Sequence, residues 1–92
     1  MTPFTLPVVT VTVPSRGDAL VIGVTIGGIA GTRVYLMIDG KRREEAGIEL
    51  LIARSIGFST VAVLEPGEHV VTLDVESGEL DQARLTVEVV RG

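Results

Sequence analysis

The sequence contains no cysteine and no tryptophan, and only 3% of its residues are aromatic. Without cysteine the chain can form neither a disulfide nor a thiolate metal site, and cysteine usage leaves the redox compartment open. There is a single histidine, His69. A lone histidine without a second ligand or a placed nucleophile excludes a zinc site or a catalytic triad built on it. We therefore predict no catalytic, metal or cofactor-binding residue.

Basic residues are in the minority, and no apolar run is long enough to cross a membrane. Lys and Arg number 8 against 12 Asp and Glu, which gives a net charge of −4. This balance argues against a nucleic-acid binder, which needs a cationic face. Segment 1–7 lacks the basic and apolar regions of a secretory signal. We expect protein partners, with no nucleic acid, membrane or small-molecule substrate, and a chain that is cytosolic at synthesis or cut from a longer protein.

Aliphatic residues, in contrast, are abundant. Hydrophobic residues make up 46% of the 92 positions, and the mean hydropathy is +0.47. A small domain has too little interior to hide this much apolar surface. We therefore expect an exposed apolar patch that serves as a contact surface.

Apolar and polar residues alternate in several short segments, as they do in half-buried β-strands. Segment 8–13 lies between Pro7 and Pro14, which predicts an edge strand. Segment 58–64 is apolar on both faces. Inward faces are predicted at Leu20, Ile22, Val24 and Ile26; at Val34, Leu36 and Ile38; at Val71, Leu73 and Val75; and at Leu85, Val87 and Val89. The spacing predicts an all-β antiparallel sandwich of about seven to eight strands over residues 8–92, preceded by an N-terminal arm, residues 1–7.

The turns follow from glycine, proline and short polar residues. Asp39-Gly40 predicts a two-residue hairpin with a short returning strand at 41–44, and Pro66-Gly67 predicts a tight turn before the next strand. Ser77-Gly78-Glu79 predicts another hairpin, and segment 27–31 a loop that breaks the second strand. Segment 48–54 has both helix-forming residues and a strand-like alternation, and we favour a strand over a helix.

Two segments resemble the immunoglobulin-like superfamily, specifically the minimal bacterial, archaeal and phage sandwiches related to PKD and fibronectin type III modules. Val34 to Lys41 is similar to their third strand and hairpin, and Leu64 to Leu73 to their E–F corner. The family often carries a tyrosine where His69 stands, whose hydroxyl bonds to upstream backbone. We expect the His69 ring to bond a backbone carbonyl in the same way. The missing cysteine pair and tryptophan exclude an antibody-type domain.

The sharpest short motif is Arg16-Gly17-Asp18, which resembles the integrin-recognition tripeptide of adhesive sandwich modules. The alternative is a turn that needs glycine and polar neighbours. In the arm, Phe4 and Leu6 are apolar, while Pro3 and Pro7 prevent a continuous ladder, so we expect these two side chains to pack against a neighbouring subunit. These five residues are the predicted interaction residues.

Two charged clusters in the sequence could also be binding sites, one for a metal ion and one for nucleic acid. Glu76, Glu79 and Asp81, with Asp74 nearby, carry oxygen ligands of the kind Ca²⁺ binds, but their spacing matches no EF-hand loop. A solvated acidic hairpin is the simpler interpretation. Segment 41–43 is basic but precedes Glu44 and Glu45, which favours a locally compensated hairpin over a nucleic-acid patch.

The sequence thus predicts a non-catalytic structural module that acts as a subunit of a larger assembly. A small leaderless sandwich that begins at its own Met resembles phage virion components, such as capsid decoration or tail proteins. The alternative is a module of a secreted or cell-surface bacterial protein that mediates adhesion, or an engineered version of one. The localisation follows the choice: the virion surface for the first, extracellular for the second.

Overall fold

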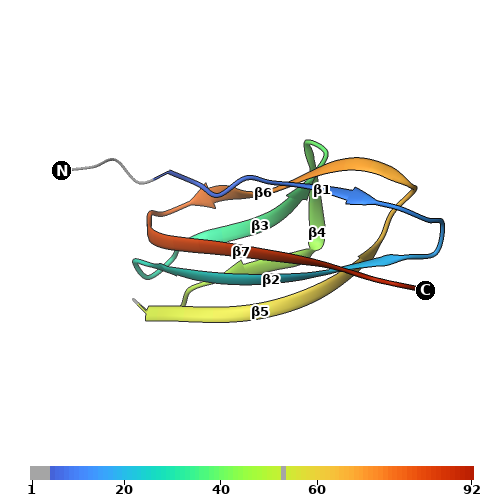
Figure 1. Ribbon diagram of the computed structural model, residues 1–92. Helices are drawn as coiled ribbons and strands as arrows, with labels where there is room; N and C mark the ends of the chain where they lie inside the picture. The colour runs from blue at the N-terminus through green and yellow to red at the C-terminus, as the bar shows by residue number, and fades with distance from the viewer. Residues whose placement is uncertain (1–4, 53) are drawn as a thin grey trace.

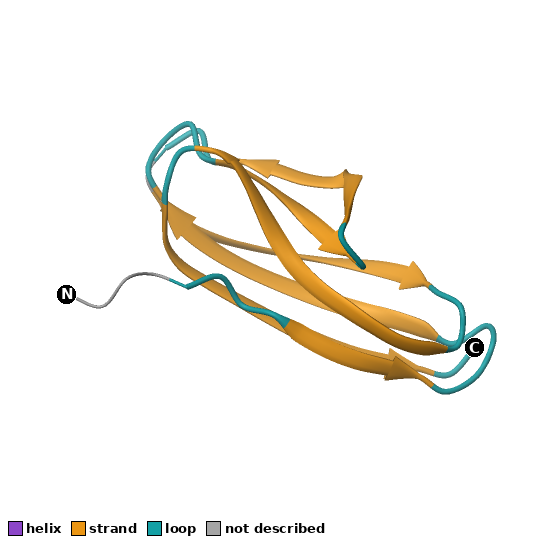
Figure 2. Cartoon of the chain, turned by 90° about the horizontal axis from the view of Figure 1, so that it is seen from above, coloured by secondary structure: helices purple, strands orange, loops and turns teal. Residues whose placement is uncertain are grey.

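The computed structural model describes residues 5–52 and 54–92, which form two antiparallel β-sheets packed face to face (Figure 1). The strands are β1 (Val9–Val13), β2 (Ala19–Gly28), β3 (Arg33–Ile38), β4 (Lys41–Glu49), β5 (Arg54–Val63), β6 (Gly67–Ser77) and β7 (Leu80–Val90). One sheet has the order β1-β6-β3-β4 and the other β5-β2-β7. The predicted all-β sandwich is confirmed. Most loops gather at the two ends of the strands (Figure 2).

The core lies between the sheets and is built from the predicted inward faces. Leu20, Ile22, Val24 and Ile26 on β2 are at most 2% exposed. They meet Val34, Leu36 and Ile38 of β3 and Val71 and Leu73 of β6, all of which are buried. Each such side chain contributes roughly 1.5–3 kcal/mol on burial. Burial of one alternate set per strand therefore fixes which face of each sheet is turned inward.

The Asp39-Gly40 hairpin is confirmed. Asp39 has a φ of 53° and Gly40 a φ of 78°, and Ile38 pairs with Lys41 across the turn. Both residues are thus left-handed, as a two-residue hairpin with the twist of its strands requires. β4 continues well beyond the predicted segment 41–44. Its register against β3 shifts between Tyr35 and Leu36, and residues 44–46 form a bulge.

The strand predicted at 48–54 is interrupted at residues 50–52, and only its two ends belong to strands. β4 ends at Glu49, a bend follows at 51–52, and β5 begins at Arg54. Leu50 is 1% exposed, and its N–H donates to the Thr32 carbonyl over 2.8 Å. The Gly31 N–H donates back to the Leu50 carbonyl over 2.7 Å. Loop-to-loop hydrogen bonds thus replace the sheet ladder here, and the described part of the segment contains no helix.

Two further turn predictions need correction. Ser77-Gly78-Glu79 does not close a hairpin, because β6 and β7 belong to different sheets. It forms a corner at which the chain crosses from one sheet to the other. Gly27 and Gly28 lie inside β2, so the predicted loop is confined to residues 29–32.

The strand order agrees only in part with the immunoglobulin resemblance. In immunoglobulin sandwiches the second strand pairs with the fifth and the third with the sixth, and β2–β5 and β3–β6 follow this rule. The first and last strands are exchanged: β1 pairs with β6, and β7 with β2. The assignment to that superfamily therefore stays a prediction.

Candidate interaction surfaces

The N-terminal arm lies against its own domain as far as the structure describes it. Leu6 is half-buried and packs on the core cluster. The Thr72 hydroxyl on β6 donates to the Pro7 carbonyl over 2.7 Å. Phe4, the other predicted contact residue of the arm, lies outside the described residues. Leu6 thus contributes to the stability of its own chain.

Arg16-Gly17-Asp18 forms a tight turn between β1 and β2. Gly17 has a φ of 91°, and the Asp18 N–H donates to the Ser15 carbonyl over 3.2 Å. Asp18 is 6% exposed, and its Oδ1 accepts the Gly92 N–H over 3.2 Å. The Arg16 side chain is in solvent, 3.5 Å from the Glu65 carboxylate. Because the Asp18 carboxylate faces the chain itself, the geometry favours the turn interpretation over integrin recognition.

The outer face of the three-stranded sheet carries an exposed apolar patch at one end. In the β-sheet register, Ala19 lies between Val63 on β5 and Val90 on β7, and Val21 lies beside Val61. Val61, Val63 and Val90 are 63%, 66% and 44% exposed. We call these five residues the apolar outer patch. The two apolar faces of segment 58–64 indicated Val61 and Val63, but only the register reveals that Ala19, Val21 and Val90 join them.

The same face becomes small and polar toward its other end. Gly23 lies between Ser59 and Thr86, and Thr25 between Gly57 and Arg84. Small side chains of β2 and β5 therefore lie beside longer polar side chains of β7 on this part of the face. A face with an apolar end bordered by polar side chains is suited to contact with another protein surface.

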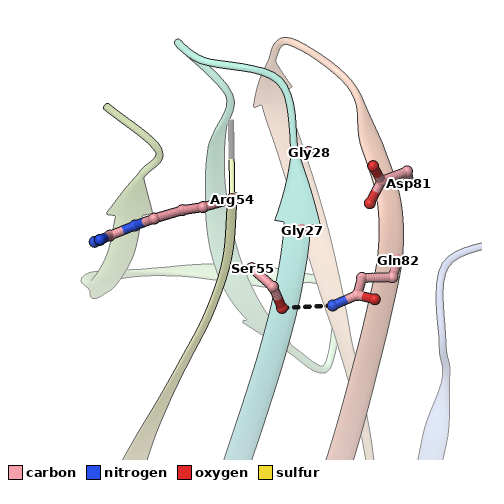
Figure 3. Close-up of a pocket in the computed structure, with 6 residues that line it drawn as sticks. All are labelled: Gly27, Gly28, Arg54, Ser55, Asp81 and Gln82. Carbon is pink, nitrogen blue, oxygen red and sulfur yellow. Dashed lines mark hydrogen bonds between the residues drawn. The ribbon is translucent and has the colours of Figure 1, made fainter. Parts of the chain in front are cut away.

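An open depression of about 340 Å³ marks the polar end of this face (Figure 3). The Gln82 amide on β7 donates to the Ser55 hydroxyl on β5, so the two side chains bridge over Gly27 on the central strand. A Cβ atom at Gly27 would lie 2.9 Å from Gln82 Cγ. The glycine thus makes room for this side-chain bridge.

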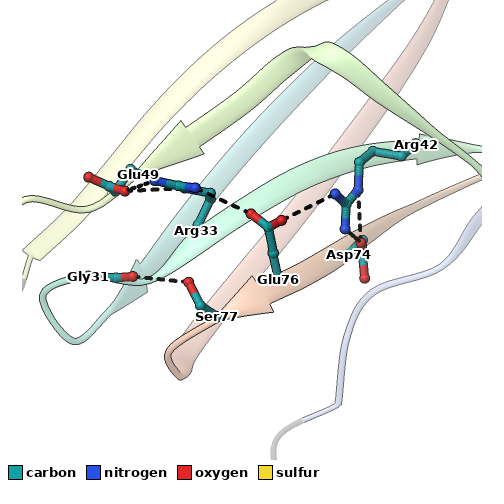
Figure 4. A network of polar contacts seen from close by, with 7 residues as sticks. All are labelled: Gly31, Arg33, Arg42, Glu49, Asp74, Glu76 and Ser77. Atoms are coloured by element: carbon teal, nitrogen blue, oxygen red, sulfur yellow. Dashed lines mark hydrogen bonds and ion pairs between the residues drawn. The ribbon is translucent and has the colours of Figure 1, made fainter.

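The outer face of the four-stranded sheet carries, in contrast, a network of ion pairs across β3, β4 and β6 (Figure 4). Arg42 lies 3.1 Å (Nε–Oδ2) from Asp74 and 3.5 Å from Glu76, with its guanidinium 4.4 Å from the centre of the Tyr35 ring. Arg33 lies 3.6 Å from Glu76 and 3.2 Å (Nε–Oε1) from Glu49. Partly exposed pairs of this kind add little stability. They make this part of the face unsuitable for apolar docking, so it differs in chemistry from the apolar outer patch.

These pairs also account for half of the acidic cluster noted in the sequence. Asp74 and Glu76 face arginines on neighbouring strands. Within residues 5–52 and 54–92, no three Asp, Glu or His side chains gather as a metal site would require. In the same ranges no helix has the length and apolar character to cross a membrane.

The His69 ring bonds a backbone carbonyl, as expected, and also bonds Asp39 of a second turn at the same end of the sandwich. Its Nε2 lies 2.7 Å from the Glu65 carbonyl oxygen and its Nδ1 lies 2.6 Å from Asp39 Oδ2. Asp39 also accepts the Val70 N–H over 2.9 Å. Both partners of the ring are acceptors, so the doubly protonated imidazolium satisfies both. The hydrogen bond to Asp39, and then that to Glu65, raises the pKa of His69, and the same bond to His69 lowers the pKa of Asp39.

This pair predicts a pH dependence of stability. Because the folded-state pKa of His69 lies above its ordinary 6.5, the contribution of His69 is complete below 6.5 and is lost as pH rises through the folded-state pKa. For Asp39, whose pKa lies below 3.8, the contribution is present above 3.8 and is lost as acid protonates it. We expect the free energy of unfolding, measured with urea, to fall from mildly acidic to mildly alkaline pH. His69→Gln should flatten this slope; an unchanged slope would contradict the assignment.

Comparisons of the chain with family models, curated proteins and solved structures found no match.

Proposed function

We propose that the protein is a non-catalytic interaction module that joins a larger assembly through the apolar outer patch. The main observation that supports this proposal is the contrast between the two outer faces. One sheet turns a network of ion pairs to solvent, whereas the other turns out Val61, Val63 and Val90. Apolar side chains collected at one end of a sheet face are stabilised when a partner covers them.

The core of such an interface is depleted in charged residues and has a polar rim. The patch fits this description. Four of its neighbours on the same face are Gly23, Ser59, Thr86 and Glu88, so a rim of small and polar side chains borders it. The narrower identity, a phage virion component, stays a prediction that depends on the resemblance.

Site-specific photo-crosslinking in cells that express the chain tests the proposal. Benzoylphenylalanine in place of Val90 should crosslink to a defined protein, identified by mass spectrometry. The matched control is the same probe in place of Val8, which precedes β1 on the other sheet and is 64% exposed. We expect crosslinks from position 90 at least about tenfold stronger than from position 8, in line with a specific patch. Equal or absent crosslinks at position 90 would refute the proposal.

A further inference from the structure

Four of the described strands lie at sheet edges: β1, β4, β5 and β7. An edge strand presents unpaired N–H and C=O groups that can pair with another chain. Proteins protect such edges with short strands, proline, charges or bulges. The protection of each edge therefore indicates which one is free to bind a strand.

Three of the four edges carry such protection. β1 has five residues and lies between Pro7 and Pro14. β4 is interrupted by its bulge and carries Lys41, Arg42, Arg43, Glu44, Glu45 and Glu49. β7 carries Asp81, Arg84 and Glu88, and its register against β2 shifts at Gly27/Gly28.

The β5 edge has none of these devices. β5 pairs with β2 through ten consecutive residue pairs without a register shift. From Ser55 to Leu64 the chain contains no charged residue and no proline. A long, regular and uncharged edge is the kind that pairs with another strand. Leu51 and Ile52, 80% and 59% exposed shortly before β5, add apolar surface at the end of this edge.

From these observations we infer that the β5 edge binds the β5 edge of a second copy of this chain, antiparallel and about a two-fold axis. The two three-stranded sheets then form one continuous sheet of the order β7-β2-β5-β5-β2-β7. The inference goes beyond the proposed function, because it concerns backbone groups at an edge and not the outer face.

Charge complementarity favours a second copy as the occupant. Arg54 begins β5 and Glu65 follows its end. Antiparallel pairing of two β5 strands brings Arg54 of each copy to the end of the other β5 that precedes Glu65, twice by symmetry, so opposite charges meet at both ends of the pair although on alternate faces of the pleat. Between these ends no like charges meet, although each copy carries a net charge of −4. In Figure 3 the Arg54 side chain extends away from β2, toward the free edge.

The pleat of the sheet restricts the register of this pair. Residues directly opposite in antiparallel strands point to the same face. Ile56, Phe58 and Ala62 are the half-buried inner residues of β5, so each must lie opposite an inner residue of the second copy. A slip by one residue would expose the inner set. Because one paired edge buries less than the roughly 1,600 Å² of a standard interface, we expect a micromolar dimer.

Amide hydrogen exchange of the full chain, followed by NMR at low micromolar and near-millimolar concentration, tests the inference. Amides alternate along a strand between the two sides. The β5 amides that face β2 should be protected at both concentrations. Those that face the free edge should gain about tenfold protection or more at the higher concentration. The outward amides of β7 should not change, and unchanged free-edge amides on β5 would overturn the inference.

A matched pair of variants separates edge pairing from docking of the outer face. Ser59 and Thr86 lie on either side of Gly23 on the same face, one on β5 and one on β7. Ser59→Lys places a positive charge on the proposed edge near its symmetry mate and should weaken the dimer at least about tenfold in sedimentation equilibrium. Thr86→Lys should leave the dimer unchanged.

Equal dimerisation of both variants, or a wild-type chain that stays monomeric at near-millimolar concentration, would refute edge pairing. Neither result would affect the crosslinks from position 90, because Val90 lies on β7, on the far side of β2 from the edge. Conversely, a failed crosslink from position 90 leaves the β5 measurement intact. The two proposals can therefore fail separately.

Discussion

Val71→Asp is expected to abolish folding. Val71 is completely buried on β6, opposite Ile38 of β3 and Val9 of β1. An aspartate there would bring a charge without a partner into the space between the sheets. We expect a loss of at least about 4 kcal/mol, which is close to the whole stability of a small domain at the lower end of the roughly 5–15 kcal/mol range.

Circular dichroism and urea unfolding would measure this loss. The control is Val8→Asp, since Val8 directly precedes β1 and is 64% exposed, so a charge there stays hydrated. That variant should change the free energy of unfolding by no more than about 0.5 kcal/mol. A folded Val71→Asp protein with an unchanged melting temperature would mean that the inward face of β6 is misassigned.

Gly78→Ala is expected to have the second-largest effect, a loss of about 2–4 kcal/mol. Gly78 sits at the corner between β6 and β7 with a φ of 85°. A Cβ atom at this position would collide with the side chain and the Cα atom of Thr32. Thr32 is fully buried, and its hydroxyl donates to the Glu79 carbonyl and accepts the Glu79 N–H, each over 3.1 Å. The methyl group would thus displace the residue that holds the corner.

Gly31→Ala isolates the steric part of this effect. Gly31 has nearly the same φ, 88°, but a Cβ atom there would meet no other atom within 4 Å. Its substitution should cost only the left-handed backbone penalty, about 1–2 kcal/mol. Thermal melting of both variants would compare the two. Equal destabilisation would show that contact with Thr32 plays no part.

The layers of this fold could be predicted from the sequence because burial alternates along each strand. Leu20 to Ile26 shows this most clearly, since its inward residues are almost fully buried. The Asp39-Gly40 hairpin was predictable for a different reason: few residues other than glycine and Asp or Asn accept the left-handed backbone of a two-residue turn.

The exchange of sheets at Ser77-Gly78-Glu79 could not be predicted in the same way. A glycine turn between two alternating strands looks the same in sequence whether the strands pair or pack on opposite layers. At this corner both backbone groups of Glu79 bond to Thr32, which is remote in sequence. The end of β4 was missed for a similar reason, because Leu50 bonds to the loop at Gly31 and Thr32.

The candidate interaction surface could be predicted only in part from the sequence. The aliphatic excess predicted an exposed patch, and Val61 and Val63 belong to it. The short motif at Arg16 to Asp18 drew attention to a turn whose carboxylate is buried. Conversely, the sequence does not show that β5 is an unprotected edge strand. This follows only from the strand order, which shows which strands have a free side.

The strand order also has a consequence for how the chain folds. Among the described strands, only β3 and β4 are both consecutive and paired. β1 cannot pair before β6 is available, because Val9 pairs with Val71. β2 likewise pairs only with β5 and β7, which come later in the chain. Closing such long loops lowers the entropy of the chain before the stabilising contacts form. Folding is therefore expected in the millisecond-to-second range of sandwiches. During synthesis, the first two strands therefore emerge from the ribosome long before their partners exist, and the hairpin at Asp39-Gly40 is the earliest structure that can form.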